Sequence, residues 1–189
     1  MAPLTQVKAP ILVLGPAYSG KSELAMQLLA PDATAIVIGT APPHEPAFAP
    51  RLTQLRGLRP PTWETLDSPT DLTAALQDSA ARTSQILVDS ISQWLATLVV
   101  HGEGHGEAAK ADAVEARLEE LCRALTATPE CRFVLVSAEV GASPAPPRPG
   151  ERLYRQLVGQ ANRRLAAVAR TVLLVHAGIP LMIKEAREG

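Results

Sequence analysis

The sequence has few aromatic residues and little net charge. Aromatic residues make up 3% of the 189 residues, so aliphatic side chains must fill the core of the folded chain. The formal net charge is −1, which provides no general attraction to nucleic acid or to an anionic membrane. We therefore expect no nucleic-acid partner and no membrane partner, and any phosphate binding must come from a local group of residues.

The sequence also lacks long apolar runs and paired cysteines. No apolar stretch approaches the roughly 20 residues that span a bilayer, and the opening "MAPLTQVKAP" has no apolar segment of a signal peptide. We therefore expect a cytoplasmic location. The two cysteines, Cys122 and Cys131, lack the spacing of a zinc site, and we interpret them as reduced thiols without a chemical role.

Apolar residues are nevertheless abundant and follow a pattern. Hydrophobic residues make up 47% of the chain, and its length suits a single domain, 1–189, with one core. Short aliphatic runs, typical of strands buried on both faces of a parallel sheet, occur at residues 11–15, 35–39, 86–89, 133–137 and 171–175. Helical patterns lie between them, at residues 22–30, 113–125 and 153–169. This alternation predicts an α/β fold: a mainly parallel sheet with helices on both faces.

Three segments rich in proline or glycine interrupt this pattern, at residues 41–50, 101–107 and 141–150. The first and third directly follow predicted strands, where open α/β sheets place ligand-binding loops. The second contains His101 and His105, which have the residue type of a metal pair. Because flanking glycines leave these histidines unfixed, we interpret the segment as a surface loop, with a metal site as the alternative.

The segment "GPAYSGKS" at residues 15–22 carries the strongest functional signal. Gly15, Gly20, Lys21 and Ser22 match G-x-x-x-x-G-K-[ST] between a predicted strand and a predicted helix. The glycines let backbone N–H groups face phosphate oxygens, the helix N-terminus adds positive potential, and Lys21 brings a full charge to the distal phosphates. The segment predicts a P-loop NTPase-like (RecA-like) fold that binds ATP or GTP. A glycine-rich turn with an incidental lysine is the structural alternative.

Two acidic residues follow predicted strands. Asp89 ends the strand at 86–89, a position from which a carboxylate reaches Mg²⁺ or a bound hydroxyl. Capping of a helix that begins near Ser90 is an alternative role, and the two roles can coexist. Glu139 has the same placement after the strand at 133–137, without a surrounding motif. We therefore expect Lys21 and Asp89 to be catalytic, and Ser22 and Asp89 to bind Mg²⁺.

With these residues in order, the chain resembles the adenosylcobinamide kinase / adenosylcobinamide-phosphate guanylyltransferase family of cobalamin biosynthesis, from about Ile11 to Lys184. Several motifs in the same order are more specific than a phosphate-binding loop alone. Beyond that loop, the matching segments are "GTA" at 39–41, "RPPTWETLD" at 59–67, "ILVDSISQWLATL" at 86–98, "EVG" at 139–141, "RLYRQLVGQANRRLA" at 152–166 and "AGIPLMIK" at 177–184.

The resemblance implies two activities. Members of this family phosphorylate a hydroxyl of adenosylcobinamide with ATP or GTP, then transfer GMP from GTP to the new phosphate through a guanylylated histidine. They form homo-oligomers, which we also expect here. The implied nucleotide contacts are Gly15, Pro16, Ala17, Tyr18, Ser19, Gly20, Lys21, Ser22, Gly39, Thr40, Ala41, Arg56, Gly57, Leu58, Arg59, Asp67 and Asp89. The candidate substrate contacts are Glu139 and Arg152.

The chain departs from the family at that histidine. The family places it four residues before the Arg-Pro pair, where this chain has Leu55, preceded by Gln54. Leucine cannot form a phosphoramidate because it has no nucleophilic nitrogen. The nearest histidine, His44, lies upstream among prolines. Other departures are Asp67 in place of Glu, Ala138 in place of Asn, Gln156 in place of Asp, and Ala47 where an acidic residue is usual.

Three functional hypotheses follow from this combination. The first is a kinase in which guanylyl transfer is weak or absent. The second is a nucleotide-binding accessory or regulatory protein that kept the phosphate-binding loop and lost the chemistry of the family. The third moves the covalent histidine to His44 and keeps both activities.

Overall fold

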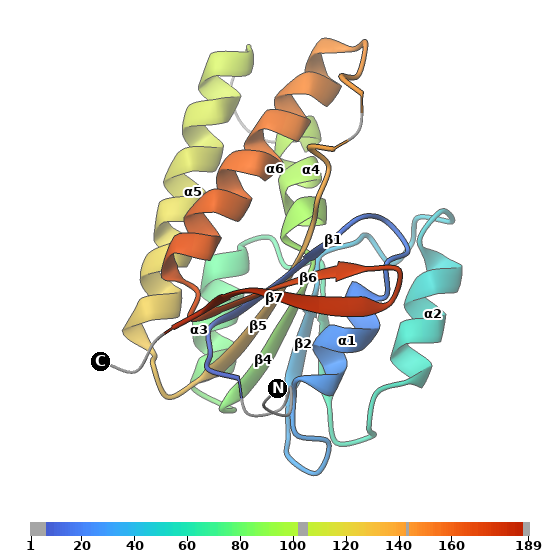
Figure 1. The fold of residues 1–189 in the computed structure, drawn as a ribbon, viewed down its shortest axis with the longest axis vertical. Coiled ribbons are helices and arrows are strands. Elements are labelled where there is room, and N and C mark those ends of the chain that lie inside the picture. The colour runs from blue at the N-terminus through green and yellow to red at the C-terminus, as the bar shows by residue number, and fades with distance from the viewer. Residues whose placement is uncertain (1–6, 102–105, 143, 187–189) are drawn as a thin grey trace.

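The computed structural model describes residues 7–101, 106–142 and 144–186, and it shows a seven-stranded sheet with helices on both faces (Figure 1). The strands are β1 (Ile11–Gly15), β2 (Ile36–Gly39), β3 (Glu64–Asp67), β4 (Gln85–Asp89), β5 (Arg132–Ala138), β6 (Thr171–His176) and β7 (Ile179–Glu185). The helices of the described residues are α1 (Lys21–Gln27), α2 (Ala49–Gly57), α3 (Leu72–Ala80), α4 (Ile91–His101), α5 (Glu107–Ala127) and α6 (Pro149–Val168).

The strands lie in the order β3-β2-β4-β5-β1-β6-β7. Every neighbouring pair is parallel except β6 and β7, which form an antiparallel hairpin. The carboxyl ends of the parallel strands therefore meet at one edge of the sheet. Because β5 separates β1 from β4, the loops after these two strands face each other across the end of β5, which is where open α/β sheets bind ligands.

The core has two layers, one on each face of the sheet. Successive residues of a strand point to opposite faces, so Leu12 packs in the layer under α3 to α6 while Val13 packs in the layer under α1. A strand buried on both faces needs an uninterrupted apolar run, which explains the aliphatic runs of the sequence. Phe133 and Trp94 are the buried aromatic residues within the described ranges, so aliphatic side chains fill most of the core.

The α/β class, the mainly parallel sheet and the helices on both faces are confirmed. The sequence patterns missed β3 and β7, the two edge strands, because neither is a continuously buried apolar run. They also missed α3, and they placed residues 41–50 and 141–150 in loops, whereas α2 begins at Ala49 and α6 at Pro149. Proline is compatible with the first turn of a helix because the N–H that it lacks has no partner there.

Of the expected surface loop at residues 101–107, residues 102–105 lie outside the described residues. His101 ends α4, and His105 is outside the described residues. Among the residues that the structure describes, no cluster of histidine, cysteine or carboxylate side chains has the makings of a metal site. No helix in the same ranges is long and apolar enough to cross a membrane. Cys122 and Cys131 are free thiols, and burial raises the pKa of Cys131 to about 11, which keeps it protonated and unreactive.

Gly15, the last residue of β1, is required by close packing. A Cβ atom at this position would lie 2.5 Å from the carbonyl oxygen of Val175 and 2.6 Å from Ser19 Oγ. Gly159 in α6 offers a matched control, since a Cβ atom there would meet no atom within 4 Å. We therefore expect replacement by alanine to lower stability at Gly15 and to raise it at Gly159.

We expect Gly15→Ala to lower the free energy of unfolding by about 1–3 kcal/mol, because backbone atoms must move to admit the methyl group. We expect Gly159→Ala to raise it by about 0.5–1 kcal/mol through the better helix propensity of alanine. Urea titrations followed by circular dichroism measure both values. A Gly15→Ala variant as stable as the parent chain would contradict the close contact.

Candidate active site

The segment Pro16–Gly20 forms a tight loop between β1 and α1. Tyr18 and Gly20 have φ values of 58° and 89°, in the left-handed region that favours glycine. The loop is held from two sides. The Glu139 N–H donates to the Gly15 carbonyl at 2.9 Å, and the Gly178 N–H donates to the Ser19 carbonyl at 2.9 Å. The end of β5 and the β6–β7 turn thus fix the conformation of the predicted phosphate-binding loop.

Lys21 and Ser22 are buried at the start of α1. The Lys21 ammonium donates a hydrogen bond of 3.0 Å to the Pro16 carbonyl, so the lysine folds back over its own loop. Burial lowers the pKa of Lys21, and the nearby Asp89 carboxylate partly offsets this effect. The amine therefore lies at the centre of the loop, opposite an acidic group.

Asp89 ends β4 and accepts a hydrogen bond from the Ser22 hydroxyl. Burial raises the pKa of Asp89, while the Ser22 hydrogen bond and the positive charge of Lys21 act in the opposite direction. A hydroxyl and a carboxylate in direct contact are the hard oxygen ligands that Mg²⁺ prefers. The residues present thus fit the Mg²⁺ site that the sequence predicts at Ser22 and Asp89.

Thr40 holds the backbone that carries Asp89. The Thr40 N–H donates to the Asp89 carbonyl at 3.1 Å, and the Thr40 hydroxyl donates to the Ser90 carbonyl at 2.7 Å. The Ser90 N–H in turn donates to the Thr40 hydroxyl at 2.9 Å. At the start of α4 the Gln93 N–H donates to the Ser90 hydroxyl, so Ser90 provides a capping contact that the sequence analysis had considered for Asp89.

Arg56, Arg59 and Asp67 form a second group beside the loop after β2. Asp67 lies opposite Gly39 in the sheet, on the side away from Asp89. Arg56 pairs with Asp67 at 2.6 Å, and Arg59 donates to the Thr65 hydroxyl at 2.6 Å. Burial lowers the pKa of Arg59, an effect that the Asp89 and Asp67 carboxylates oppose. These arginines therefore extend the polar edge of the site away from the loop.

A cavity of about 430 Å³ opens in front of the loop, at the carboxyl ends of β4 and β5. Its polar and charged lining includes Lys21, Ser22, Asp89 and Glu139. The remaining side chains that line it are Ala17, Tyr18, Ala41, Ala47, Phe48, Arg51, Leu52, Leu55, Ser90, Ser92, Gln93, Ala138, Val140 and Tyr154. The lining thus combines groups that can bind phosphate with an apolar part of the wall, to which Phe48, Leu52, Leu55 and Val140 contribute.

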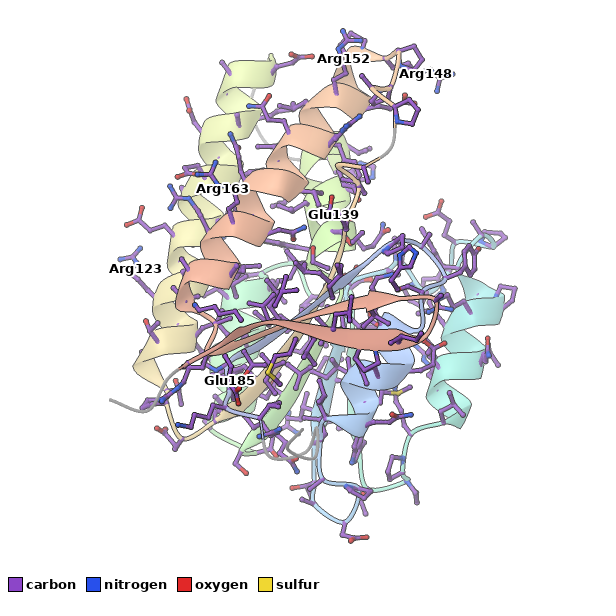
Figure 2. All side chains as sticks on the ribbon, viewed as in Figure 1. Arg123, Glu139, Arg148, Arg152, Arg163 and Glu185 are labelled. Carbon is purple, nitrogen blue, oxygen red and sulfur yellow. The ribbon has the colours of Figure 1, made fainter. Side chains whose placement is uncertain are left out.

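The structure separates the two candidate substrate contacts. Glu139 lines the cavity, where its carboxylate accepts a hydrogen bond of 2.6 Å from the Gly141 N–H. Figure 2 shows Arg152 near the outer end of α6, well away from Glu139. The Arg152 guanidinium donates to the carbonyls of Pro146 and Pro147. Arg152 thus stabilises the proline-rich segment and does not reach the cavity. Leu58 is also turned outward, with 57% of its surface exposed.

The sequence analysis missed several residues that line the cavity. Arg51 comes from the first turn of α2, a helix that the sequence patterns did not predict. Three of the few aromatic residues, Tyr18, Phe48 and Tyr154, also lie on the cavity wall. Burial raises the pKa of Tyr154, and a hydrogen bond with Ser92 lowers it. Because the sequence has so few aromatic residues, each one could have been considered as a candidate for the site, which would have included Phe48 and Tyr154.

Leu55, which replaces the histidine of the family resemblance, is buried and lines the cavity. Its side chain reinforces the apolar wall and offers no nitrogen to a nucleotide. His44 is exposed in the segment before α2 and is not among the residues that line the cavity. The geometry therefore gives no support to His44 as a replacement for the missing histidine.

Comparisons with known proteins identify the family of the chain. The family described as "Cobinamide kinase / cobinamide phosphate guanyltransferase" matches residues 11–183. A Pseudomonas aeruginosa relative, named bifunctional adenosylcobalamin biosynthesis protein CobP, is 31% identical over 174 residues, 92% of the chain and 96% of the relative. A Salmonella typhimurium relative, named bifunctional adenosylcobalamin biosynthesis protein CobU, is 32% identical over 180 residues, 92% of the chain and 99% of the relative. The chain therefore belongs to the cobinamide kinase / cobinamide phosphate guanyltransferase family, in which it combines a complete phosphate-binding loop with a leucine at position 55.

Proposed function

We propose that the chain is a kinase that transfers a phosphoryl group from ATP or GTP to a hydroxyl of a corrinoid, adenosylcobinamide. The observation that carries this proposal is that Lys21, Ser22 and Asp89 line one cavity. The family description, which names a cobinamide kinase, supports the same acceptor. The rings of Phe48 and Tyr154, which line the cavity, suit the planar face of a corrinoid ring or of a nucleotide base.

In this proposal the charge of Lys21 compensates the negative charge of the distal phosphates. The ammonium leaves the Pro16 carbonyl, its present acceptor, when phosphate oxygens become available. Charge-assisted hydrogen bonds to phosphate are stronger than a bond to a neutral carbonyl, which favours this exchange. The N–H groups of the loop, fixed by Gly178 and Glu139, bind further phosphate oxygens without reorganisation.

Asp89 and Ser22 supply the second element of the mechanism. Their contacting oxygens would hold Mg²⁺, which supplies positive charge to the transferring phosphoryl group. Asp89 also orients the attacking hydroxyl of the acceptor at the mouth of the cavity. Thr40 keeps the backbone of Asp89 in place, so the carboxylate is preorganised before the substrate binds.

The guanylyl-transfer half of the family activity is absent in this proposal. Leu55 occupies the position of the covalent histidine, and no histidine lines the cavity among the described residues. GMP thus finds no histidine nitrogen in the cavity with which to form the covalent bond. Product formation would end at the phosphate monoester.

A second candidate function is a nucleotide-binding accessory or regulatory protein. One observation favours it: Ala47, Leu55 and Ala138, three positions that differ from the family pattern, all line the cavity. Small or apolar side chains thus replace polar ones where the acceptor would bind.

A homo-oligomer and a cytoplasmic location stay predictions. Ile179, Leu181 and Ile183, which are exposed along β7, offer an apolar strip that such an assembly would cover.

Lys21→Ala tests the nucleotide site. We expect this variant to bind ATP or GTP more weakly by about tenfold or more in the presence of Mg²⁺, because a charge-assisted contact to phosphate is lost. Lys110→Ala is the control, since Lys110 contacts the Val99 carbonyl on α4 and does not line the cavity. Isothermal titration calorimetry measures the nucleotide affinity of both variants. If the parent chain and Lys21→Ala bind nucleotide with equal affinity, the assignment of this loop as the phosphate-binding site is wrong.

Labelling with α-³²P-GTP tests the loss of guanylyl transfer. We expect no acid-labile, base-stable GMP adduct on the parent chain, because Leu55 offers no nitrogen. We expect Leu55→His to acquire the label, since position 55 faces the cavity. Labelled parent protein would contradict the proposal, and loss of that label in His44→Ala would then identify His44 as the acceptor.

Asp89→Asn separates the kinase from the accessory protein. For a kinase, adenosylcobinamide with Mg²⁺ and ATP yields a phosphate monoester, and Asp89→Asn slows turnover by about 10²-fold or more while nucleotide still binds. Asp78→Asn, a change on the exposed surface of α3, should leave turnover unchanged. If the parent chain binds nucleotide but forms no monoester, the accessory function is favoured instead.

A further inference from the structure

Arg51 is a charged residue of the cavity to which the proposed mechanism gives no role. It lies in α2, and it lines the cavity together with Lys21 and Asp89. Of the arginines within the described residues, it is the one on the cavity wall. Arg56 and Arg59 lie farther along α2 and beyond it, where they contact Asp67 and Thr65. Arg51 is therefore the guanidinium that faces the phosphate-binding loop.

The present contacts of Arg51 are all with the loop and the start of α1. Its Nη2 lies 3.5 Å from Glu23 Oε2, and its guanidinium lies over the Tyr18 ring, 5.8 Å from the centroid. About a third of each side chain of the ion pair is exposed, which makes this a weakly held pair. Glu23 Oε2 is buried and accepts no hydrogen bond from the described residues. Arg51 is thus held near the loop by charge, without a hydrogen bond to Glu23.

The charge of Arg51 acts on the catalytic groups. It contributes to the lowered pKa of Lys21 and partly opposes the rise that burial causes in the pKa of Asp89. Lys21 marks the position of the distal phosphates in a loop of this type. Because Arg51 lines the same cavity as Lys21 and Asp89, its guanidinium is within range of a phosphoryl group bound in that cavity.

We propose that Arg51 leaves Glu23 and Tyr18 when a nucleoside triphosphate binds, and that it then pairs with the terminal phosphate. This inference rests on the proposed function for the identity of the ligand. The planar guanidinium donates two parallel hydrogen bonds to a phosphate, which the ion pair with Glu23 does not provide. The pairing makes the site prefer triphosphates to diphosphates and stabilises the charge of the phosphoryl group during transfer.

Nucleotide binding and turnover test this role. Calorimetry with Mg²⁺ compares AMP-PNP with ADP, and GMP-PNP with GDP. We expect Arg51→Ala to weaken triphosphate binding by about tenfold or more and diphosphate binding by less than about twofold. Arg51→Lys should keep part of the preference, since lysine retains the charge but not the paired geometry. Arg82→Ala is the matched control, because Arg82 also pairs with a glutamate, Glu64, and does not line the cavity.

A variant of Glu23, which pairs with Arg51, should have the opposite effect on triphosphate binding. Glu23→Gln removes the charge that holds Arg51, so triphosphate binding should become tighter and the preference over diphosphate should increase. In the double variant with Arg51→Ala this gain in preference should disappear, because Glu23 acts on the terminal phosphate through Arg51. This pair of results cannot come from a merely structural contact between α1 and α2, which would change stability without changing the preference.

The outcomes separate this inference from the kinase proposal. Unchanged triphosphate preference in Arg51→Ala, or equal losses for both nucleotides, would overturn the role of Arg51. If Arg51→Ala does not fold, as judged by thermal denaturation, Arg51→Lys and Glu23→Gln decide the question. A preference that depends on Arg51, in a chain that forms no corrinoid phosphate, supports Arg51 as the triphosphate contact and counts against the kinase.

Discussion

The contact between the Ser22 hydroxyl and the Asp89 carboxylate is the interaction on which the site depends. It joins α1 to β4 across the end of β5, the strand that separates β1 from β4. Buried polar groups are costly unless they satisfy one another, and Ser22, Asp89 and the nearby Lys21 do so at the edge of an apolar core. The parallel strands bring these residues together because their carboxyl ends share one edge of the sheet.

The hairpin of β6 and β7 supports the loop from the other side. Gly15 approaches the Val175 carbonyl so closely that only a hydrogen atom fits, and the Gly178 N–H holds the Ser19 carbonyl. The C-terminal hairpin thus contributes to the shape of a loop more than 150 residues earlier in the chain. A change in β6 can therefore alter phosphate binding without touching a phosphate.

The residues that line the cavity follow the family pattern at some positions and depart from it at others. Lys21, Ser22 and Asp89 line it, as the phosphate-binding motif predicts, whereas Ala47, Leu55 and Ala138 make the lining less polar than the family pattern. This contrast underlies our proposal that the chain carries out the nucleotide step without the covalent guanylyl step. Tyr18, Phe48 and Tyr154 give the same cavity planar, largely apolar surfaces in a sequence with few aromatic residues.

The sequence by itself determined the α/β class, the central strands and the composition of the phosphate-binding loop. Strands buried on both faces need uninterrupted apolar runs, and a phosphate-binding loop needs glycine, lysine and a hydroxyl at set spacings, so local patterns reveal both. Only the tertiary structure decided which distant residues meet. It brought Arg51 and Tyr154 to the cavity and left Arg152 at the outer end of α6. The tertiary structure also decided the edge strands β3 and β7 and the start of α2. Their residues gain stability from neighbours far away in the chain, so no periodic pattern of apolar residues marks them in the sequence.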